Sequence, residues 1–94
     1  MAYEIIWSSN AEDDFRAIIG YFMDQWADDF ADKFGEQVLK TISLIEKHPY
    51  IGMETESLSS IRKIAVNQHY TLYYLVVRQE IIICNLYQNS RNKG

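Results

Sequence analysis

Two apolar stripes at helical spacing, separated by a short break, dominate the first half of this 94-residue sequence. The first stripe is Phe15, Ile18, Ile19, Phe22 and Trp26, and the second is Phe30, Phe34, Val38, Ile42 and Ile45. Residues three and four apart lie on one face of a helix, so each stripe predicts an amphipathic helix that turns one face to a core. The break around residues 25–27 is short, which predicts that the two helices pack as an antiparallel hairpin.

Residues that favour helix ends bound both predicted helices. Ser9 and Glu12 match a capping box, in which each side chain satisfies a free backbone N–H at a helix start. The second helix is predicted over residues 28–47, because two aspartates open it and Lys47 closes it, as the helix dipole favours. Pro49 then prevents the helix from continuing.

The second half of the chain changes to strand character. Residues 61–66, 70–77 and 81–87 are rich in β-branched and aromatic side chains, and short connections join them, which predicts a three-stranded antiparallel meander. Residues 3–7 predict a short first strand. The expected fold is therefore α+β, in the order β-α-α-β-β-β, with the helical hairpin packed on one face of a small antiparallel sheet. We expect a single domain over residues 1–94.

The helical hairpin covers only one face of the predicted sheet, so the alternation of side chains along each strand assigns residues to sides. In the last strand, alternation groups Ile82, Cys84 and Leu86 on one side and Ile81, Ile83, Asn85 and Tyr87 on the other. Alternation leaves open whether Leu72 with Tyr74, or Tyr73 with Leu75, faces the helices. The expected core is Phe15, Ile18, Phe22, Phe34, Val38, Ile42, Leu72, Tyr74 and Ile83.

Charge is distributed unevenly along the chain, whose net charge is −4. Residues 1–59 carry 12 acidic and four basic side chains, whereas residues 60–94 carry one acidic and five basic side chains. This predicts two faces of opposite potential, with a pattern that serves only solubility as the alternative. Arg62 or Lys63 is expected to share the open sheet face with Tyr87 and Arg91. Such a face suits RNA, another anionic backbone or the acidic tail of a partner peptide.

Several classes of protein and site find no support in the sequence. The single cysteine cannot form an internal disulfide, and the chain has neither a signal peptide nor an apolar run of membrane-spanning length. We therefore expect a soluble cytoplasmic protein without a membrane partner. No metal-ligand spacing, Ser/His/Asp set or glycine-rich phosphate loop is present, so no metal or cofactor is expected. His69 is a solvated turn residue or a general acid/base.

Several segments, in their order, resemble the RelE/ParE toxins of bacterial type II toxin–antitoxin systems: YEIIWSSNAEDDFRAIIGYF, HPYIG, IRKIAV, HYTLYYLV and IIICNLYQNSRN. The similarity covers nearly the whole chain. It implies a growth-inhibiting toxin with a part in plasmid stabilization, held in a hetero-oligomeric complex by a cognate antitoxin. ParE-like members poison DNA gyrase without being nucleases, and RelE-like members are endoribonucleases that cleave mRNA on the ribosome. Both activities occur on one fold, so the fold does not choose between them.

The resemblance also implies functional residues. RelE-like catalysis relies on basic residues of the sheet together with a C-terminal tyrosine or histidine. The catalytic candidates in the RNA-cleaving case are Tyr87, Arg62, Arg78 and Arg91. The binding candidates are Lys63, His69, Tyr87 and Arg91. This set of cations is small and the chain is acidic, which favours the ParE-like alternative over ribosome-dependent cleavage.

Overall fold

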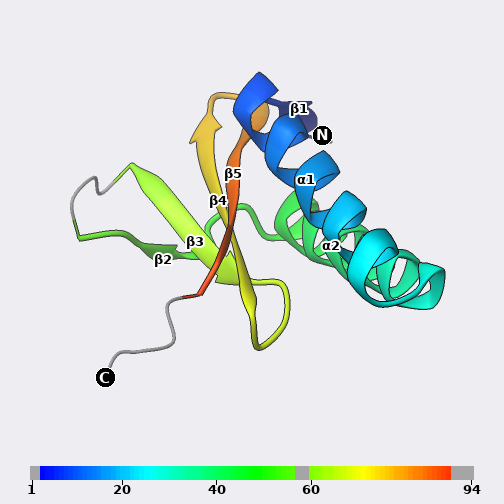
Figure 1. Ribbon diagram of the computed structural model, residues 1–94. Helices are drawn as coiled ribbons and strands as arrows, with labels where there is room; N and C mark the ends of the chain where they lie inside the picture. Colours follow the sequence, from blue (N-terminus) through cyan, green and yellow to red (C-terminus); the bar gives the residue numbers. More distant parts are fainter. Residues whose placement is uncertain (1–2, 57–59, 90–94) are drawn as a thin grey trace.

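A helical hairpin lies along one face of a five-stranded sheet in the computed structural model (Figure 1), which describes residues 3–56 and 60–89. The elements in chain order are β1 (Glu4–Trp7), α1 (Ser9–Gln25), α2 (Asp28–Lys47), β2 (Met53–Glu54), β3 (Ile61–Ala65), β4 (Tyr70–Val77) and β5 (Glu80–Gln88). The predicted α+β class and helical hairpin are confirmed. The two-residue strand β2 was not predicted.

The strands follow the order β1-β5-β4-β3-β2 across the sheet. Strands β3, β4 and β5 form the predicted antiparallel meander, and β2 pairs antiparallel with β3. Strand β1 pairs parallel with β5, which brings the first and last strands of the chain together at one edge. Parallel strands require a crossover connection, so everything between β1 and β5, including the helical hairpin on one sheet face, lies within that crossover.

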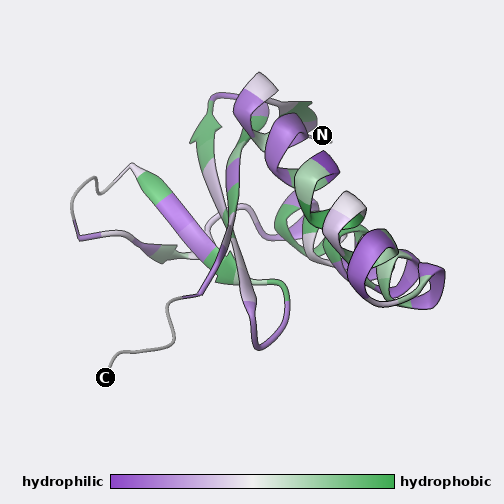
Figure 2. Cartoon of the chain, in the orientation of Figure 1, coloured by the Kyte–Doolittle hydropathy of each residue, from purple (hydrophilic) through white to green (hydrophobic). Residues whose placement is uncertain are grey.

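Both helices are amphipathic, and Figure 2 shows hydrophilic and hydrophobic residues alternating around them. Helix α2 has the predicted bounds, whereas α1 begins at Ser9 with Ser8 as its cap. The Ser8 Oγ accepts a hydrogen bond from the Ala11 N–H at 3.0 Å, so the predicted cap at Ser9 was wrong. Among the described residues, neither helix is long and apolar enough to cross a membrane.

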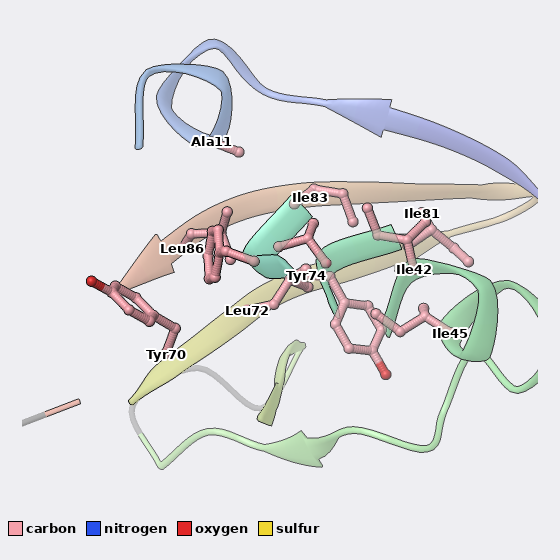
Figure 3. Close-up of a cluster of buried hydrophobic side chains, with 11 residues drawn as sticks. Ala11, Ile42, Ile45, Tyr70, Leu72, Tyr74, Ile81, Ile83 and Leu86 are labelled. Carbon is pink, nitrogen blue, oxygen red and sulfur yellow. The ribbon is translucent and has the colours of Figure 1, made fainter. Parts of the chain in front are cut away.

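The core lies between the sheet and the helices, mainly on β4, β5 and α2 (Figure 3). Six residues of the predicted core are buried, namely Phe34, Val38, Ile42, Leu72, Tyr74 and Ile83. The other three are partly buried and pack against that cluster, namely Phe15, Ile18 and Phe22. Leu72 and Tyr74 face the helices, which resolves the alternative that alternation along β4 left open.

A β-bulge interrupts the alternation of β5. Tyr73 is opposite Asn85 and Tyr74 is opposite Ile83, so Cys84 is an extra residue in the ladder. The extra residue reverses the sides that follow it, and Leu86 is therefore buried together with Ile83. The predicted grouping of β5 side chains was wrong beyond this point, because it assumed an uninterrupted alternation.

The start of α1 supplies hydrogen bonds to β5 where β1 ends. The Ser8 N–H donates to the Ile83 carbonyl and the Ser8 hydroxyl donates to the Cys84 carbonyl, each at 3.0 Å. Two residues after Cys84, the Leu86 N–H donates to the Asp14 carboxylate at 3.0 Å. The same carboxylate oxygen accepts from the Asn85 side-chain amide at 3.2 Å. These contacts satisfy backbone groups of the bulged edge that would otherwise need another strand.

The segment between α2 and β2 is held against the sheet by the buried Tyr74. Its hydroxyl accepts from the Gly52 N–H and donates to the Pro49 carbonyl, each at 2.8 Å. The Arg62 guanidinium donates to the Gly52 carbonyl at 2.6 Å and to the Tyr50 carbonyl at 3.2 Å. Two side chains of the meander therefore fix the loop that leads into β2.

The far end of the hairpin extends past the sheet (Figure 1). Trp26 and Phe30 both belong to the predicted core-facing stripes, yet they are 60% and 47% exposed. Neither belongs to the expected core set, and their place on the stripes does not bury them, because helical spacing identifies a face of the helix but not how far the sheet beneath it reaches.

Burial raises the pKa of three side chains above their ordinary values. The pKa of the Tyr74 phenol is raised from 10.0 by burial, against smaller lowering effects of the Gly52 hydrogen bond and the Arg62 charge. The pKa of Tyr70 is raised from 10.0 by burial and then by the charge of Tyr21. Burial also raises the pKa of the Cys84 thiol from 9.0.

Alkaline pH is expected to destabilise the fold through these three groups. Each deprotonates in the unfolded chain at a lower pH than in the folded chain, so its contribution is complete below the unfolded pKa and is lost as pH rises through the folded pKa. The free energy of unfolding, measured with urea, should therefore fall from about pH 9 upward. Cys84→Ala should remove the part of the decrease in the free energy of unfolding that occurs at the lowest pH, because the thiol has the lowest ordinary pKa of the three groups. A stability that stays constant from neutral pH into the tyrosine range would contradict this expectation.

Gly52→Ala should destabilise the protein, because an added Cβ would lie 2.6 Å from the Tyr74 Oη and 3.0 Å from the Lys63 carbonyl oxygen. Overpacking of this kind costs about 1–3 kcal/mol. Gly20→Ala in α1 is the matched control, since nothing lies within 4 Å of its added Cβ. That control should gain about 0.5–1 kcal/mol from helix propensity. Urea unfolding curves of the two variants test both signs, and equal effects would contradict the proposed contact.

Candidate functional site

The sheet face that turns away from the helices carries a shallow hollow of about 550 Å³. The pairing of β3, β4 and β5 sets Lys63 opposite Tyr73 and Thr71 opposite Tyr87, with Tyr73 opposite Asn85. Paired residues of neighbouring strands point to the same side of a sheet, so these side chains share one face. We call this concavity the open-face hollow, and its lining includes Met53, Lys63, Thr71, Tyr73, Tyr87 and Asn89.

Two tyrosines form the aromatic part of the open-face hollow. The rings of Tyr73 and Tyr87 lie with centroids 5.6 Å apart and planes tilted by 57°. Tyr87 is 52% exposed, and the bulge at Cys84 is what turns it to this face while Leu86 enters the core. Tyr87 was a predicted site residue, whereas Tyr73 was not. The sequence could have identified Tyr73, because it lies between the core residues Leu72 and Tyr74 on β4 and therefore points to the opposite face.

The structure distinguishes between the two neighbouring cations of β3. Lys63 is exposed and lines the open-face hollow. Arg62 lies on the helix side of the sheet, where it holds the α2–β2 loop, pairs with Glu54 at 3.5 Å and lies 5.0 Å from the centre of the Tyr50 ring. Of the two predicted alternatives, Lys63 therefore shares the face of Tyr87.

The remaining predicted site residues do not join Lys63 and Tyr87. Arg78 lies in the β4–β5 turn with φ 57, seven residues along the chain from Thr71, the β4 partner of Tyr87. At about 3.3 Å per residue, this separates the two positions by about 23 Å. His69 lies in the β3–β4 turn and lines a different groove, together with Phe22 and Trp26. Arg91 lies outside the described residues.

Hydrogen bonds fix the end of β5 beside the hollow. The Thr71 hydroxyl donates to the Asn89 side-chain oxygen at 2.6 Å. The Asn89 N–H donates to the His69 carbonyl at 2.7 Å, and its side-chain amide donates to the Gln68 carbonyl at 2.9 Å. Asn89 therefore ties the last described residue of the chain to the β3–β4 turn and holds Tyr87 in a defined position.

Acidic residues lie close to Lys63. A second hollow borders the first through their shared residues Met53, Lys63 and Tyr73, and Glu54 and Glu56 also line it. A phosphate at Lys63 would meet the negative potential of Glu56, whereas the charge of Glu54 is partly offset by its pair with Arg62. Within the described residues, the predicted positive face is therefore a single lysine bordered by two glutamates.

The open-face hollow has the chemistry of a binding surface for a planar or anionic group. The tyrosine rings offer stacking surfaces and Lys63 offers one positive charge, with the Asn89 amide at the rim. Within residues 3–56 and 60–89, no three His, Cys, Asp or Glu side chains converge where they could hold a metal ion. The catalytic roles of Tyr87, Arg62, Arg78 and Arg91 and the binding roles of Lys63 and His69 stay predictions.

Solved structures with this architecture include toxins. A chain of the chromosomal ParDE TA system from P. aeruginosa superposes with a TM-score of 0.80 at 15% identity, covering 94% of this chain and 97% of that one. The YoeB dimer from Staphylococcus aureus gives a TM-score of 0.68 at 18% identity, with 94% and 98% covered. The YoeB/ParE toxin from Agrobacterium tumefaciens gives 0.65 at 11% identity, with 93% and 99% covered. At these identities the likeness shows the fold alone.

Sequence comparison supplies the family. No curated protein sequence matches the chain significantly. The family model described as "ParE toxin of type II toxin-antitoxin system, parDE" matches residues 5–92. That match spans nearly the whole chain, from the second residue of β1 to beyond the end of β5. The chain therefore belongs to the ParE toxin family of type II toxin–antitoxin systems.

Proposed function

We propose that this chain is a toxin that arrests growth by acting on DNA gyrase and that a cognate antitoxin neutralises it in a hetero-oligomeric complex. The observation that carries the choice of gyrase is the small number of cations at the open-face hollow. Lys63 lines it, while Arg62 is engaged on the opposite side of the sheet and Arg78 lies at the far end of β4. The match to the ParE family model supports the same choice.

Cleavage of RNA by a metal-free site requires several groups at one phosphate. A base must deprotonate the 2′-hydroxyl, an acid must protonate the leaving oxygen, and cations must stabilise the charged transition state. Among the described residues, Lys63 and the two tyrosine phenols are near one another, and Glu54 and Glu56 add negative charge beside them. This is a weak constellation for catalysis and a sufficient one for binding a protein surface.

Ribosome-dependent mRNA cleavage is the second candidate, and one observation favours it. Tyr87 is exposed, lies 5.6 Å from Tyr73 between ring centroids and shares its face with Lys63. A phenol and an ammonium beside stacking rings suit a single-stranded nucleotide. In that case the chain is an endoribonuclease, with Tyr87 as the acid/base group.

Both candidates act inside the cell, since gyrase and the ribosome are cytoplasmic targets. Neutralisation by an antitoxin is also the basis of the proposed role in plasmid stabilization, because cells that lose the antitoxin are exposed to the toxin. The antitoxin is expected from an adjacent reading frame.

A supercoiling assay beside a primer-extension assay distinguishes the candidates. We expect the purified protein to inhibit supercoiling by gyrase and to leave mRNA uncut in a translation reaction. Tyr87→Phe keeps the ring and removes the hydroxyl, so it should change growth arrest by no more than about twofold. Tyr50→Phe is the matched control, because Tyr50 is 61% exposed and lies off the open-face hollow.

Cut mRNA in the presence of the wild-type protein would overturn the gyrase proposal. In that event Tyr87→Phe should lower cleavage by at least about tenfold. Lys63→Ala should then weaken charge stabilisation by about 2–4 kcal/mol, as should Arg91→Ala if that residue reaches the phosphate. Lys40→Ala on α2 controls for the simple loss of a positive charge.

A further inference from the structure

Four aliphatic side chains form a row across the sheet face that the helical hairpin leaves uncovered (Figure 1). Ile6 of β1 is opposite Ile82 of β5. Leu75 of β4 is opposite both Ile82 and Ile61 of β3, so the row runs through four neighbouring strands. All four side chains are half-buried, and none belongs to the core cluster or packs against it. We call these residues the aliphatic row.

The aliphatic row lies where solvated side chains would be expected. An antiparallel sheet that packs on one face normally carries polar residues on its other face. Adjacent strands lie about 4.8 Å apart, so four strands make the aliphatic row about 14 Å wide. A contiguous apolar patch on an uncovered face marks a surface that another molecule covers.

The β4–β5 turn, at one end of this face, holds an arginine in a backbone conformation that favours glycine. Val77 pairs with Glu80, so Arg78 and Gln79 form a two-residue turn, in which Arg78 has φ 57. A side chain with a Cβ is disfavoured at positive φ. Arg78 is exposed and makes no side-chain hydrogen bond or salt bridge within residues 3–56 and 60–89. The fold therefore gains no contact there that offsets the strain.

Two like charges meet beside Arg78. Glu4 is directly opposite Glu80, so the two carboxylates lie on one side of the sheet and repel each other. Neither has a cation within 4.0 Å in the described part of the chain. Alternation from Ile82 and Leu75 places Glu80, Glu4 and Val77 on the face of the aliphatic row.

These residues line a hollow of about 570 Å³, which we call the turn hollow. Its lining combines Glu4, Arg78 and Glu80 with Val77, which is 40% exposed. The strained arginine and the opposed glutamates both weaken the fold at one place. Local features that disfavour the fold without compensation are expected at functional sites.

The charges of the turn hollow indicate the class of its partner. Arg78 suits a carboxylate, whereas Glu4 and Glu80 suit cations or hydrogen-bond donors. A nucleic-acid backbone carries negative charge alone, so the two glutamates would repel it and the aliphatic row would offer it nothing. A protein surface can present both signs of charge around an apolar centre.

From these observations we propose that the protein target of the toxin docks across the whole uncovered sheet face, from the open-face hollow to the turn hollow. The aliphatic row packs on an apolar patch of the target, and Arg78 binds a target carboxylate. Val77 lies about 20 Å along β4 from Thr71, a span that one protein interface of standard size can cover. The inference rests on the proposed function, in which the target is gyrase, and adds the surface that holds it.

Arg78→Gly tests the proposal with a variant that cannot fail through misfolding. Glycine adopts positive φ without strain, so the midpoint of thermal unfolding should rise by a few degrees. The protein concentration that halves supercoiling by purified gyrase should rise at least about tenfold, because arginines in interfaces are frequent hot spots. Lys40→Ala on α2 removes the same charge from another exposed position and should change that concentration by no more than about twofold.

Glu80→Gln tests the class of the partner. Removal of the repulsion with Glu4 should raise the unfolding midpoint, while the half-inhibitory concentration should rise about threefold. Stronger inhibition by Glu80→Gln would indicate a polyanionic partner and overturn the proposal. An Arg78→Gly variant that is more stable than the wild type and equally inhibitory would overturn it as well.

Leu75→Lys tests the aliphatic row. The variant should lose inhibition of gyrase by at least about tenfold, because the lysine ammonium would enter the apolar centre of the interface. Leu39→Lys is the matched control, since Leu39 is 65% exposed on α2 and lies off the sheet face, and it should stay within about twofold of the wild type. Light scattering of the purified protein tests a second copy as the occupant. A dimer that Leu75→Lys dissociates would overturn the proposal.

Growth arrest in cells separates this inference from the proposed function. Inhibition of gyrase that is unchanged in Arg78→Gly and Leu75→Lys overturns the inference and leaves the proposed function standing. Growth arrest by a wild-type protein that does not inhibit gyrase overturns the proposed function instead. In that case the inference stands if both variants weaken growth arrest at equal protein level, and it is overturned if they do not.

Discussion

The extra residue Cys84 in β5 allows this one strand to contribute side chains both to the core and to the open-face hollow. Before it, Ile81 and Ile83 face the helices, and after it Leu86 does so while Tyr87 turns to the opposite face. Without the bulge, alternation from Ile81 and Ile83 would turn Leu86 away from the core and turn Tyr87 toward it. The bulge is stable because Ser8 and Asp14 of the α1 region bind the backbone of β5 at Cys84 and Leu86. The geometry of the open-face hollow therefore depends on hydrogen bonds made on the far side of the same strand.

Patterns that repeat over many residues predicted the fold well. The stripe of α2, its acidic start and Pro49 after its end defined the helix Asp28–Lys47, and the apolar run of β4 defined Tyr70–Val77. Features that depend on one or two residues were not predictable in this way. Strand β2 has two residues, too few for any alternation to appear. The capping-box match with Glu12 favoured Ser9 as the cap, whereas in the structure Ser8 is the cap and also donates to the Cys84 carbonyl of β5.

The candidate site was predicted only in part, because it too depends on features of one or two residues. Alternation placed Arg62 and Lys63 on opposite sides of β3 but did not say which side the helices cover. That choice follows from Tyr74, whose buried hydroxyl binds the Gly52 loop and draws Arg62 to the same side. Helical spacing put Trp26 and Phe30 on the core-facing stripes, yet both lie next to the turn between α1 and α2 and are exposed. The end of the hairpin extends past the sheet (Figure 1). An apolar helix stripe that extends beyond the sheet it packs on therefore indicates a groove at the end of the helix.

The parallel pairing of β1 with β5 also affects when the protein becomes folded during its synthesis. The ribosome makes β1 first and β5 last, and Ile81, Ile83 and Leu86 complete the buried cluster only after the helices have emerged. Contacts between distant parts of a chain form late and slowly, because a long loop must close first. A nascent toxin would therefore have neither its complete core nor its Tyr87 surface until β5 has been made. This order would give an antitoxin that is made beforehand time to be present when the toxin matures.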